Sequence, residues 1–187
     1  MTEQELVSAA QQGDADAFGA LVEQNQARVY ALACRMVGNP EDAGDLTQET
    51  FLHAWKGISK FNGQSAFYTW LYRLCSNACI DFLRREGRRG AVSLTQEEDG
   101  GDATRQMEVP DRTYDPQRAL ERQEAKASVE RALEAISPEH RQALVLREFE
   151  GLSYQEIGQV LGVEPGTVKS RIARARLALR DYLVRHG

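Results

Sequence analysis

The sequence contains few of the residues that build disulfide-rich, metal-binding or membrane-spanning proteins. Only three cysteines occur in 187 residues, at Cys34, Cys75 and Cys79, and this odd number fits neither a disulfide framework nor a structural zinc site. No run approaches the roughly 20 apolar residues that cross a membrane, and the polar N-terminus lacks the pattern of a signal peptide. We therefore expect a soluble, cytoplasmic protein with no cofactor, no metal and no direct membrane insertion.

Motifs of catalytic sites are also absent from the sequence. The histidines, His53, His140 and His186, are scattered, and neither a phosphate-binding loop nor a G-x-S-x-G elbow occurs. Cys75 and Cys79 lie one helical turn apart, a spacing that would allow metal binding or oxidation, but two buried small residues are the better explanation. We expect that the protein is not an enzyme.

The net charge of -5 is distributed unevenly along the chain. Residues 1–83 carry 5 basic and 10 acidic side chains, and residues 91–116 carry 2 and 7. In contrast, residues 84–90 carry 4 basic and 1 acidic side chain, and residues 164–187 carry 6 basic and 2 acidic ones. Because the arrangement of charge decides where a polyanion binds, the acidic total does not exclude nucleic acid as a partner. The sequence predicts two local basic patches.

Apolar residues recur at three- and four-residue steps through most of the chain, and no alternating run suggests a strand. This pattern predicts an all-α fold. Residues 91–116 interrupt it, because they combine prolines and a glycine pair with seven acidic side chains and few large apolar ones. We therefore expect two small helical domains, residues 1–90 and 117–187, joined by a flexible acidic linker at residues 91–116.

Capping residues mark several helix boundaries. Thr2 with Glu5 and Ser153 with Glu156 form capping-box patterns. A serine followed by proline, as at Ser137, is typical of a helix start. Gly13 is expected to end a helix, and Asp14 to cap the next one. A break is expected at residues 38–40. A further helix is predicted at residues 64–85, and Gly151 is placed to end the helix that begins after Ser137.

The C-terminal region has the pattern of a helix-turn-helix. The short capped helix after Ser153 leads through a turn at Gly162 into a helix rich in Lys and Arg. A solvated basic surface helix is the alternative, which the capped preceding helix and the turn spacing disfavour. Val168, Ile172, Ala175 and Leu179 would pack inward on a helical wheel. The opposite face presents Ser170, Ala173 and Arg174 to a major groove, with Thr167, Lys169, Arg171, Arg176 and Arg180 placed for phosphates.

A second candidate surface lies in the first half of the chain. Asp45, Gln48, Glu49 and Leu52 share one helical face, at steps of three, four and seven. An acidic face with one exposed leucine suits a basic partner helix, although a simple solvated face has the same composition. The inward stripe of the same helix would contain Ala43, Thr47, Phe51, Ala54, Trp55 and Ile58.

Residues 61–72 concentrate aromatic side chains. Phe67 has the spacing of a core residue, whereas Tyr68, Thr69, Arg73 and Asn77 are difficult to place in a core. Aromatic, amide and guanidinium groups beside a loop are the groups that hold unstacked bases of single-stranded DNA. This helix is therefore a candidate single-strand binding element.

Taken together, these segments resemble the extracytoplasmic-function (group 4) sigma factors of bacterial RNA polymerase. The matching strings are GDADAF, DLTQETFLHAW, KFNGQSAFYTWLYRLCSNACIDFLRR, ISPEHR and GLSYQEIGQVLGVEPGTVKSRIARAR. They cover both expected domains in the family order, with a variable linker between them. The resemblance implies a non-enzymatic subunit that reads promoter -35 and -10 elements and assists DNA melting.

The resemblance also implies roles for individual residues. The face of Asp45, Gln48, Glu49 and Leu52 would grip the polymerase clamp helices. The loop at residues 61–66 would capture a flipped base of the -10 element. The full set of residues that would contact this element is Phe61, Asn62, Gly63, Gln64, Ser65, Ala66, Tyr68, Thr69, Trp70, Arg73, Asn77 and Arg84. Contacts to the -35 element would come from Thr167, Lys169, Ser170, Arg171, Ala173, Arg174 and Arg176. Asn62 stands where many relatives carry a basic residue, which bears on the base preference at the -10 element. Ala173 is small where some relatives carry a bulkier side chain, which bears on the preference at the -35 element.

The partners that the resemblance implies are core RNA polymerase, through its clamp helices and flap, promoter DNA and an anti-sigma factor. The acidic linker would thread through polymerase channels. In the holoenzyme the chain would be nucleoid-associated, and a membrane-anchored anti-sigma factor would hold it at the membrane. The alternative function is a stand-alone helix-turn-helix transcription regulator, which the aromatic helix disfavours.

Overall fold

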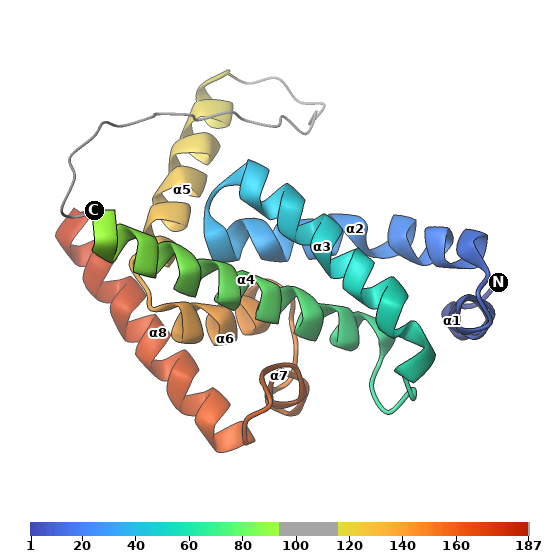
Figure 1. The fold of residues 1–187 in the computed structure, drawn as a ribbon. Helices are drawn as coiled ribbons and strands as arrows, with labels where there is room; N and C mark the ends of the chain where they lie inside the picture. Colours follow the sequence, from blue (N-terminus) through green and yellow to red (C-terminus); the bar gives the residue numbers. More distant parts are fainter. Residues whose placement is uncertain (94–115, 187) are drawn as a thin grey trace.

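The computed structural model describes residues 1–93 and 116–186, so most of the expected linker lies outside the described residues. Within these ranges the chain forms eight α-helices and one short 3-10 helix and contains no strand (Figure 1). The prediction of an all-α fold is confirmed. The helices are α1 (Glu3–Gln11), α2 (Ala15–Val37), α3 (Pro40–Gly57), η1 (Ile58–Lys60), α4 (Phe67–Ser93), α5 (Pro116–Glu134), α6 (Pro138–Glu148), α7 (Tyr154–Leu161) and α8 (Pro165–His186).

Polar caps begin helices where the sequence predicts them. Thr2 and Glu5 form a reciprocal capping box at α1, and Ser153 and Glu156 do so at α7. Each box satisfies N–H groups that have no partner inside the helix. At α6 the prediction is confirmed only in part. The helix begins with proline at its first position, but the Ser137 side chain makes no capping hydrogen bond.

Helices α1 to α4 form the N-terminal helical group, in which α2 packs against the other three. Its core contains Leu21, Leu32, Met36, Phe67 and Leu71, all nearly inaccessible to solvent. Helix α4 begins three residues later than expected and continues through the basic stretch into the expected linker. The late start leaves the residues before it as a loop at one end of the group.

Helices α5 to α8 form the C-terminal helical group. Helix α6 packs along α8, and α7 lies across both. Leu146, Ile157 and Ile172 fill the space between these three helices. The inward residues predicted for α8 are confirmed, because Val168, Ile172 and Ala175 are buried and Leu179 is partly buried.

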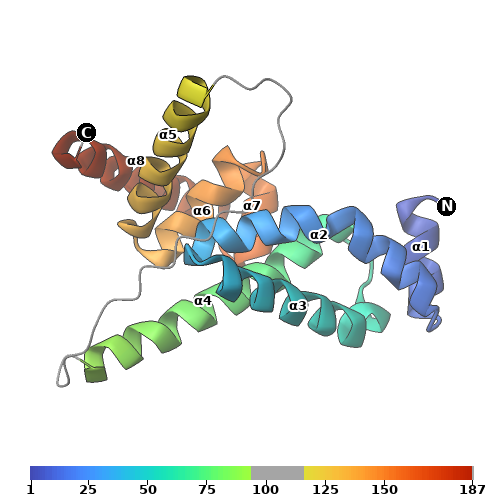
Figure 2. The same cartoon turned by 90° about the horizontal axis from the view of Figure 1, so that it is seen from above.

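The two groups pack directly on each other. Helices α2 and α4 contact α6, α4 also contacts α7, and α2 contacts α5. Figure 2 shows α6 and α7 lying beside α2 and α4. Buried residues of both groups belong to one continuous cluster. The division into domains at residues 1–90 and 117–187 stays a prediction, and the contact between the groups is a feature that the sequence did not indicate.

Candidate nucleic-acid interface

The turn between α7 and α8 depends on two glycines. Gly162 ends α7 with φ of +66°, in the left-handed region that side chains with a Cβ rarely adopt. At Gly158 the constraint is space, because a Cβ there would lie 2.7 Å from the carbonyl oxygen of Val163. These glycines bring α7 and the start of α8 together in the helix-turn-helix arrangement that the spacing predicts.

The outer face of α8 carries the side chains that the sequence analysis assigned to duplex DNA. Ser170 donates a hydrogen bond to the Thr167 carbonyl at 2.9 Å, and Arg176 forms an ion pair with Glu148 of α6. In the described part of the chain Arg174 has neither a hydrogen bond nor an ion pair, so its guanidinium is available to a ligand. Arg171 is partly buried, and the exposed residues of this set are Thr167, Lys169, Ser170, Ala173, Arg174 and Arg176.

The loop before α4 is held in place by α1. The Gln11 side-chain amide donates hydrogen bonds to the carbonyl oxygens of Ile58, at 3.0 Å, and Phe61, at 2.7 Å. Within the loop, the Asn62 side-chain oxygen accepts a hydrogen bond from the Gln64 N–H at 3.1 Å, and Gly63 has φ of +69°. These hydrogen bonds fix the loop against the end of α1 and shape its turn.

An aromatic cluster lies beneath this loop. The rings of Phe61 and Trp70 lie 5.1 Å apart, and Phe67 lies 5.7 Å from each of them. Phe67 is buried, whereas Phe61 and Trp70 are partly exposed. A partly exposed aromatic ring offers a stacking surface to an unstacked base.

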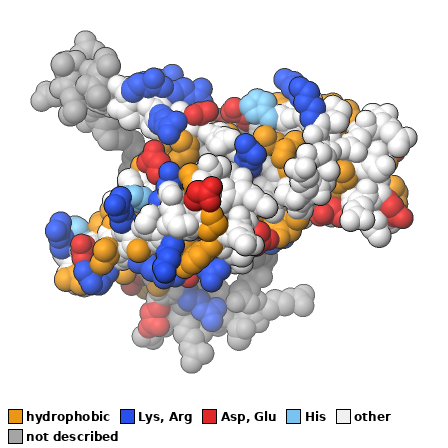
Figure 3. Space-filling view, turned by 90° about the horizontal axis from the view of Figure 1, so that it is seen from below, with side chains coloured by type: hydrophobic (Ala, Val, Ile, Leu, Met, Phe, Trp, Pro, Cys, Tyr) orange, Lys and Arg blue, Asp and Glu red, His pale blue; other side chains and the backbone are white. Residues whose placement is uncertain are grey.

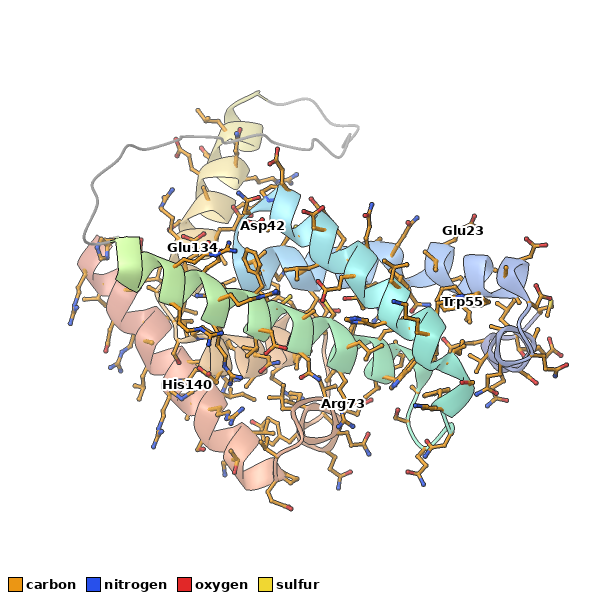
Figure 4. All side chains as sticks on the ribbon, in the orientation of Figure 1. Glu23, Asp42, Trp55, Arg73, Glu134 and His140 are labelled. Carbon is orange, nitrogen blue, oxygen red and sulfur yellow. The ribbon has the colours of Figure 1, made fainter. Side chains whose placement is uncertain are left out.

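Of the residues predicted to bind single-stranded DNA on α4, most are accessible and one is not. Arg73, Asn77 and Arg84 are exposed, and Tyr68 is partly buried. The expectation that Thr69 lies outside the core is wrong, because only 3% of Thr69 is accessible. Figure 4 shows Arg73 on α4, on the side where α7 packs.

Two tyrosines of α4 connect the helical groups. The Tyr68 hydroxyl donates a hydrogen bond to Glu156 of α7 at 2.9 Å, and the Tyr72 hydroxyl donates one to Glu150 at 2.5 Å. Burial and the hydrogen bond to Glu150 raise the pKa of Tyr72 well above its ordinary value, so the hydroxyl stays protonated as a donor. The sequence does not indicate the roles of Tyr72 and Glu150, since a contact between residues so distant in sequence leaves no periodic signal.

The acidic face of α3 is exposed as predicted. Asp45, Gln48 and Leu52 point to solvent, Glu49 is partly buried, and 60% of the Leu52 side chain is accessible. The prediction that Trp55 points inward is only partly correct. Its ring packs against Phe18 at 4.9 Å, between α3 and α2 (Figure 4), yet 38% of the residue is accessible.

Basic side chains gather at one end of the molecule. Figure 3 shows Lys and Arg on the side where α4 and α8 end. Several of these cations are paired. Arg84 lies 3.6 Å from Glu139, and Arg89 lies 3.0 Å from Glu86. The pairs leave this surface with a moderate rather than a strong positive charge.

The two cysteines of α4 lie together in the core. Cys75 and Cys79 are buried with their sulfurs 4.0 Å apart, and their mutual hydrogen bond together with burial raises the pKa of Cys79, which keeps that thiol protonated. Among the described residues, no group of three His, Cys, Asp or Glu side chains is arranged to hold a metal ion. None of the described helices has the length and apolar character to cross a bilayer.

Comparison with known proteins finds two segments of this chain that match family models. Residues 21–89 match the model of sigma-70 region 2, and residues 126–179 match sigma-70 region 4. Region 2 thus spans α2 to α4, and region 4 spans α5 to α8 with the helix-turn-helix.

Several curated proteins are similar over most of this chain. The RNA polymerase sigma-H factor of Pseudomonas aeruginosa is 40% identical, over 97% of this chain and 93% of its own length. The ECF RNA polymerase sigma-E factor of Escherichia coli K12 is 37% identical, over 96% of this chain and 93% of its own length. The ECF sigma factor SigE of Mycolicibacterium smegmatis is 41% identical over 89% of this chain, which spans 62% of that longer protein.

Solved structures agree with these similarities. CnrH, solved in complex with the cytosolic domain of CnrY, has a TM-score of 0.69 at 26% identity and covers 99% of both chains. The sigma factor RpoE from Bartonella quintana, solved with the anti-sigma factor NepR, has a TM-score of 0.68 at 25% identity and covers 89% of this chain and 96% of its own. With two matching region models and relatives that it covers almost completely, this chain belongs to the extracytoplasmic-function (ECF) family of RNA polymerase sigma factors.

Proposed function

We propose that this chain binds core RNA polymerase and directs it to promoters by reading a -35 element with α8 and a -10 element with α4 and the preceding loop. It does not catalyse a reaction itself. The observation that carries this proposal is the presence of both sigma regions in one chain, each with exposed residues of the required chemistry. A stand-alone regulator would need only the helix-turn-helix, and nothing in such a protein would require the aromatic loop or the acidic face of α3.

At the -35 element, Arg174 is the side chain best suited to read a base. Its guanidinium is exposed and unpaired in the described part of the chain, and arginine binds the guanine edge in the major groove with two hydrogen bonds. Ser170 and the small Ala173 beside it allow the helix to approach the groove closely. Thr167, Lys169, Arg171 and Arg176 flank these residues and suit contacts to phosphates.

At the -10 element, the loop at residues 61–66 and the exposed side of α4 suit single-stranded DNA. Partly exposed rings of Phe61 and Trp70 supply stacking surfaces, and Arg73 and Asn77 supply polar contacts one helical turn apart. Holding a base outside the duplex lowers the free energy of the melted state relative to the closed state. Tyr68, Arg84 and the remaining loop residues complete this proposed surface.

For polymerase, we propose the acidic face of α3 as a docking surface. Leu52 supplies an apolar contact within a ring of Asp45, Gln48 and Glu49, as expected of a small interface with a polar rim. The protein would then act in the cytoplasm, and partners of the anti-sigma class, like those solved with its relatives, would control its access to polymerase.

The docking face can be tested with two neighbouring substitutions. Leu52→Arg should reduce binding to core polymerase by at least about tenfold, because it places a cation against a basic partner surface. His53→Arg is the matched control, since His53 is exposed on the adjacent side of α3. Binding of each purified variant to core enzyme would be measured by size-exclusion chromatography and fluorescence titration. Equal affinities for both variants would assign docking to another surface.

A further inference from the structure

A pocket of 350 Å³ lies between α1 and the loop before α4. This volume is at the lower end of the range for small-molecule sites. One wall is formed by Phe61, Asn62, Ser65 and neighbouring loop residues, and the other by α1, with Gln4, Val7, Ser8 and Gln11. Helix α1 precedes the segment that matches region 2, which begins at residue 21.

Polar groups on the loop side of the pocket are already partly occupied. The Asn62 side-chain oxygen accepts from the Gln64 N–H, the Ser65 hydroxyl donates to the Ala66 carbonyl at 3.3 Å, and Gln11 holds the loop backbone. Gln4 and Ser8 are exposed, and their side chains make no hydrogen bond within the described part of the chain. The available side-chain donors and acceptors of the pocket therefore come largely from α1.

We propose that α1 forms the second wall of the base-capture site and that Gln4 and Ser8 contact the edge of the captured base. This inference rests on the proposed function of the loop. The Gln4 amide presents a hydrogen-bond donor and an acceptor side by side, and the Ser8 hydroxyl can either donate or accept. Together the two side chains can distinguish bases by the donors and acceptors on their edges. The aromatic rings under the loop hold the base by stacking, which is tolerant of base identity. Helix α1 would then set which base is preferred.

The test is promoter selection by holoenzyme from a DNA library randomised across the -10 element. Transcripts would be sequenced for wild type, Gln4→Ala, Ser8→Ala and the control Gln12→Ala, whose side chain is exposed at the end of α1 outside the pocket. We expect Gln4→Ala to weaken selection at one position by at least about threefold while other positions and Gln12→Ala stay unchanged. Unchanged preference in both pocket variants would overturn the role of α1. Absence of any selection in the wild type would instead contradict the proposed function.

A second inference rests on different observations, the contacts between the two helical groups. Glu150, next to the C-terminal end of α6, accepts a hydrogen bond from Tyr72 of α4 and forms an ion pair with Arg35 of α2 at 3.4 Å. Its side chain is only 6% accessible. A nearly buried carboxylate is stable only with such partners, and both of them belong to the other group.

Glu156 makes the corresponding contact from α7. One of its oxygens accepts from the Ser153 N–H and caps the helix, and the other accepts from the Tyr68 hydroxyl. The same carboxylate thus joins the first turn of the helix-turn-helix to a residue of the proposed -10 surface. While this contact is made, the Tyr68 hydroxyl is not available to DNA.

We infer that the free chain is held closed by these contacts, and that the two groups separate before α4 engages single-stranded DNA. The Glu150 and Glu156 carboxylates compete with DNA for the side of α4 that carries Tyr68 and Tyr72. In a protein whose binding-competent state is a minor one, the apparent affinity falls in proportion to the population of that state. The closed form would lower the affinity of the free chain for DNA.

Glu150→Ala and Glu148→Ala provide a matched pair of full-length variants. Both remove a carboxylate near the end of α6, but Glu148 pairs with Arg176 inside the C-terminal group, whereas Glu150 contacts the N-terminal group. Small-angle scattering should give a larger radius of gyration for Glu150→Ala than for wild type and Glu148→Ala, at equal helix content by circular dichroism. A fluorescein-labelled (dT)12 strand should bind Glu150→Ala about tenfold more tightly than wild type.

The two readouts separate the possible failures. Identical dimensions for wild type and Glu150→Ala would overturn the role of Glu150 in holding the chain closed. An expanded Glu150→Ala chain that binds (dT)12 no better than wild type would overturn the competition with DNA. If none of the variants binds the strand at all, the proposed single-strand surface on α4 is also contradicted.

Discussion

Arg141 of α6 donates a hydrogen bond from its guanidinium to the main-chain carbonyl of Met36 near the end of α2. The same side chain donates to the carbonyls of Glu134 and Ile136, each at 3.0 Å, and only 5% of the residue is accessible. Burial lowers the pKa of Arg141, but arginine still remains protonated at neutral pH. One arginine thus satisfies backbone acceptors in both helical groups.

Removal of this side chain should destabilise the protein strongly. Arg141→Ala leaves buried carbonyl oxygens without partners, and we expect it to lower the free energy of unfolding by roughly 2–4 kcal/mol. Arg147→Ala is the comparison, because Arg147 donates to Leu152 within the C-terminal group and stacks on Tyr154. Urea unfolding followed by circular dichroism measures both. A smaller loss for Arg141→Ala than for Arg147→Ala would contradict the bridging role.

Arg174→Ala should weaken duplex binding selectively. If the guanidinium reads a base, the loss is roughly 1–3 kcal/mol on the preferred -35 sequence and close to zero on unrelated duplexes. Holoenzyme binding to matched and mutated -35 duplexes measures the difference. A uniform loss on every sequence would assign Arg174 to the phosphate backbone.

Asn77→Ala should impair promoter opening while -35 binding is retained. Asn77 is exposed on α4, and loss of one polar contact to an unstacked base should reduce the open-complex fraction roughly threefold to tenfold. Permanganate footprinting of holoenzyme on promoter DNA reports the melted thymines. Unchanged reactivity of these bases would remove Asn77 from the -10 surface.

The cap of α7 should make the stability of the protein depend on pH. Hydrogen bonds from the Ser153 backbone and from Tyr68 lower the pKa of Glu156 below its ordinary 4.5. Because the folded-state pKa is the lower one, this contribution is present above about pH 4.5 and is lost as the pH falls through the folded-state value. Glu156→Gln should therefore lower the melting temperature at pH 7 and cease to differ from wild type in acid. A difference in melting temperature between wild type and Glu156→Gln that stays constant from pH 7 into acid would contradict this role of Glu156. Glu164→Gln, at an exposed position, serves as the control.

Local features of this fold are predictable from the sequence. Spacing in the sequence reveals features that depend on residues within a few positions of each other. These are the capping boxes at Thr2 and Ser153, the turn at Gly162 and the inward stripe of α8. The exposed residues of α8 and the acidic face of α3 follow from the same helical periodicity. These elements supply most of the candidate -35 and polymerase surfaces.

Features that depend on contacts between distant segments were not predictable. The sequence does not indicate that Tyr72 meets Glu150, nor that Arg141 reaches the end of α2, because neither pair is linked by a short-range pattern. The burial of Thr69 has a similar origin. Its polar side chain suggested an exposed position, but the folded chain buries it.

Initiation by reconstituted holoenzyme tests the central proposal most directly. The purified chain would be added to core RNA polymerase with fragmented genomic DNA from the same bacterium, and the 5′ ends of the transcripts would be mapped. We predict new start sites that share two sequence elements at a fixed spacing and that disappear with Leu52→Arg. Transcript ends identical to those made by core enzyme alone would contradict the proposal that this chain directs promoter-specific initiation.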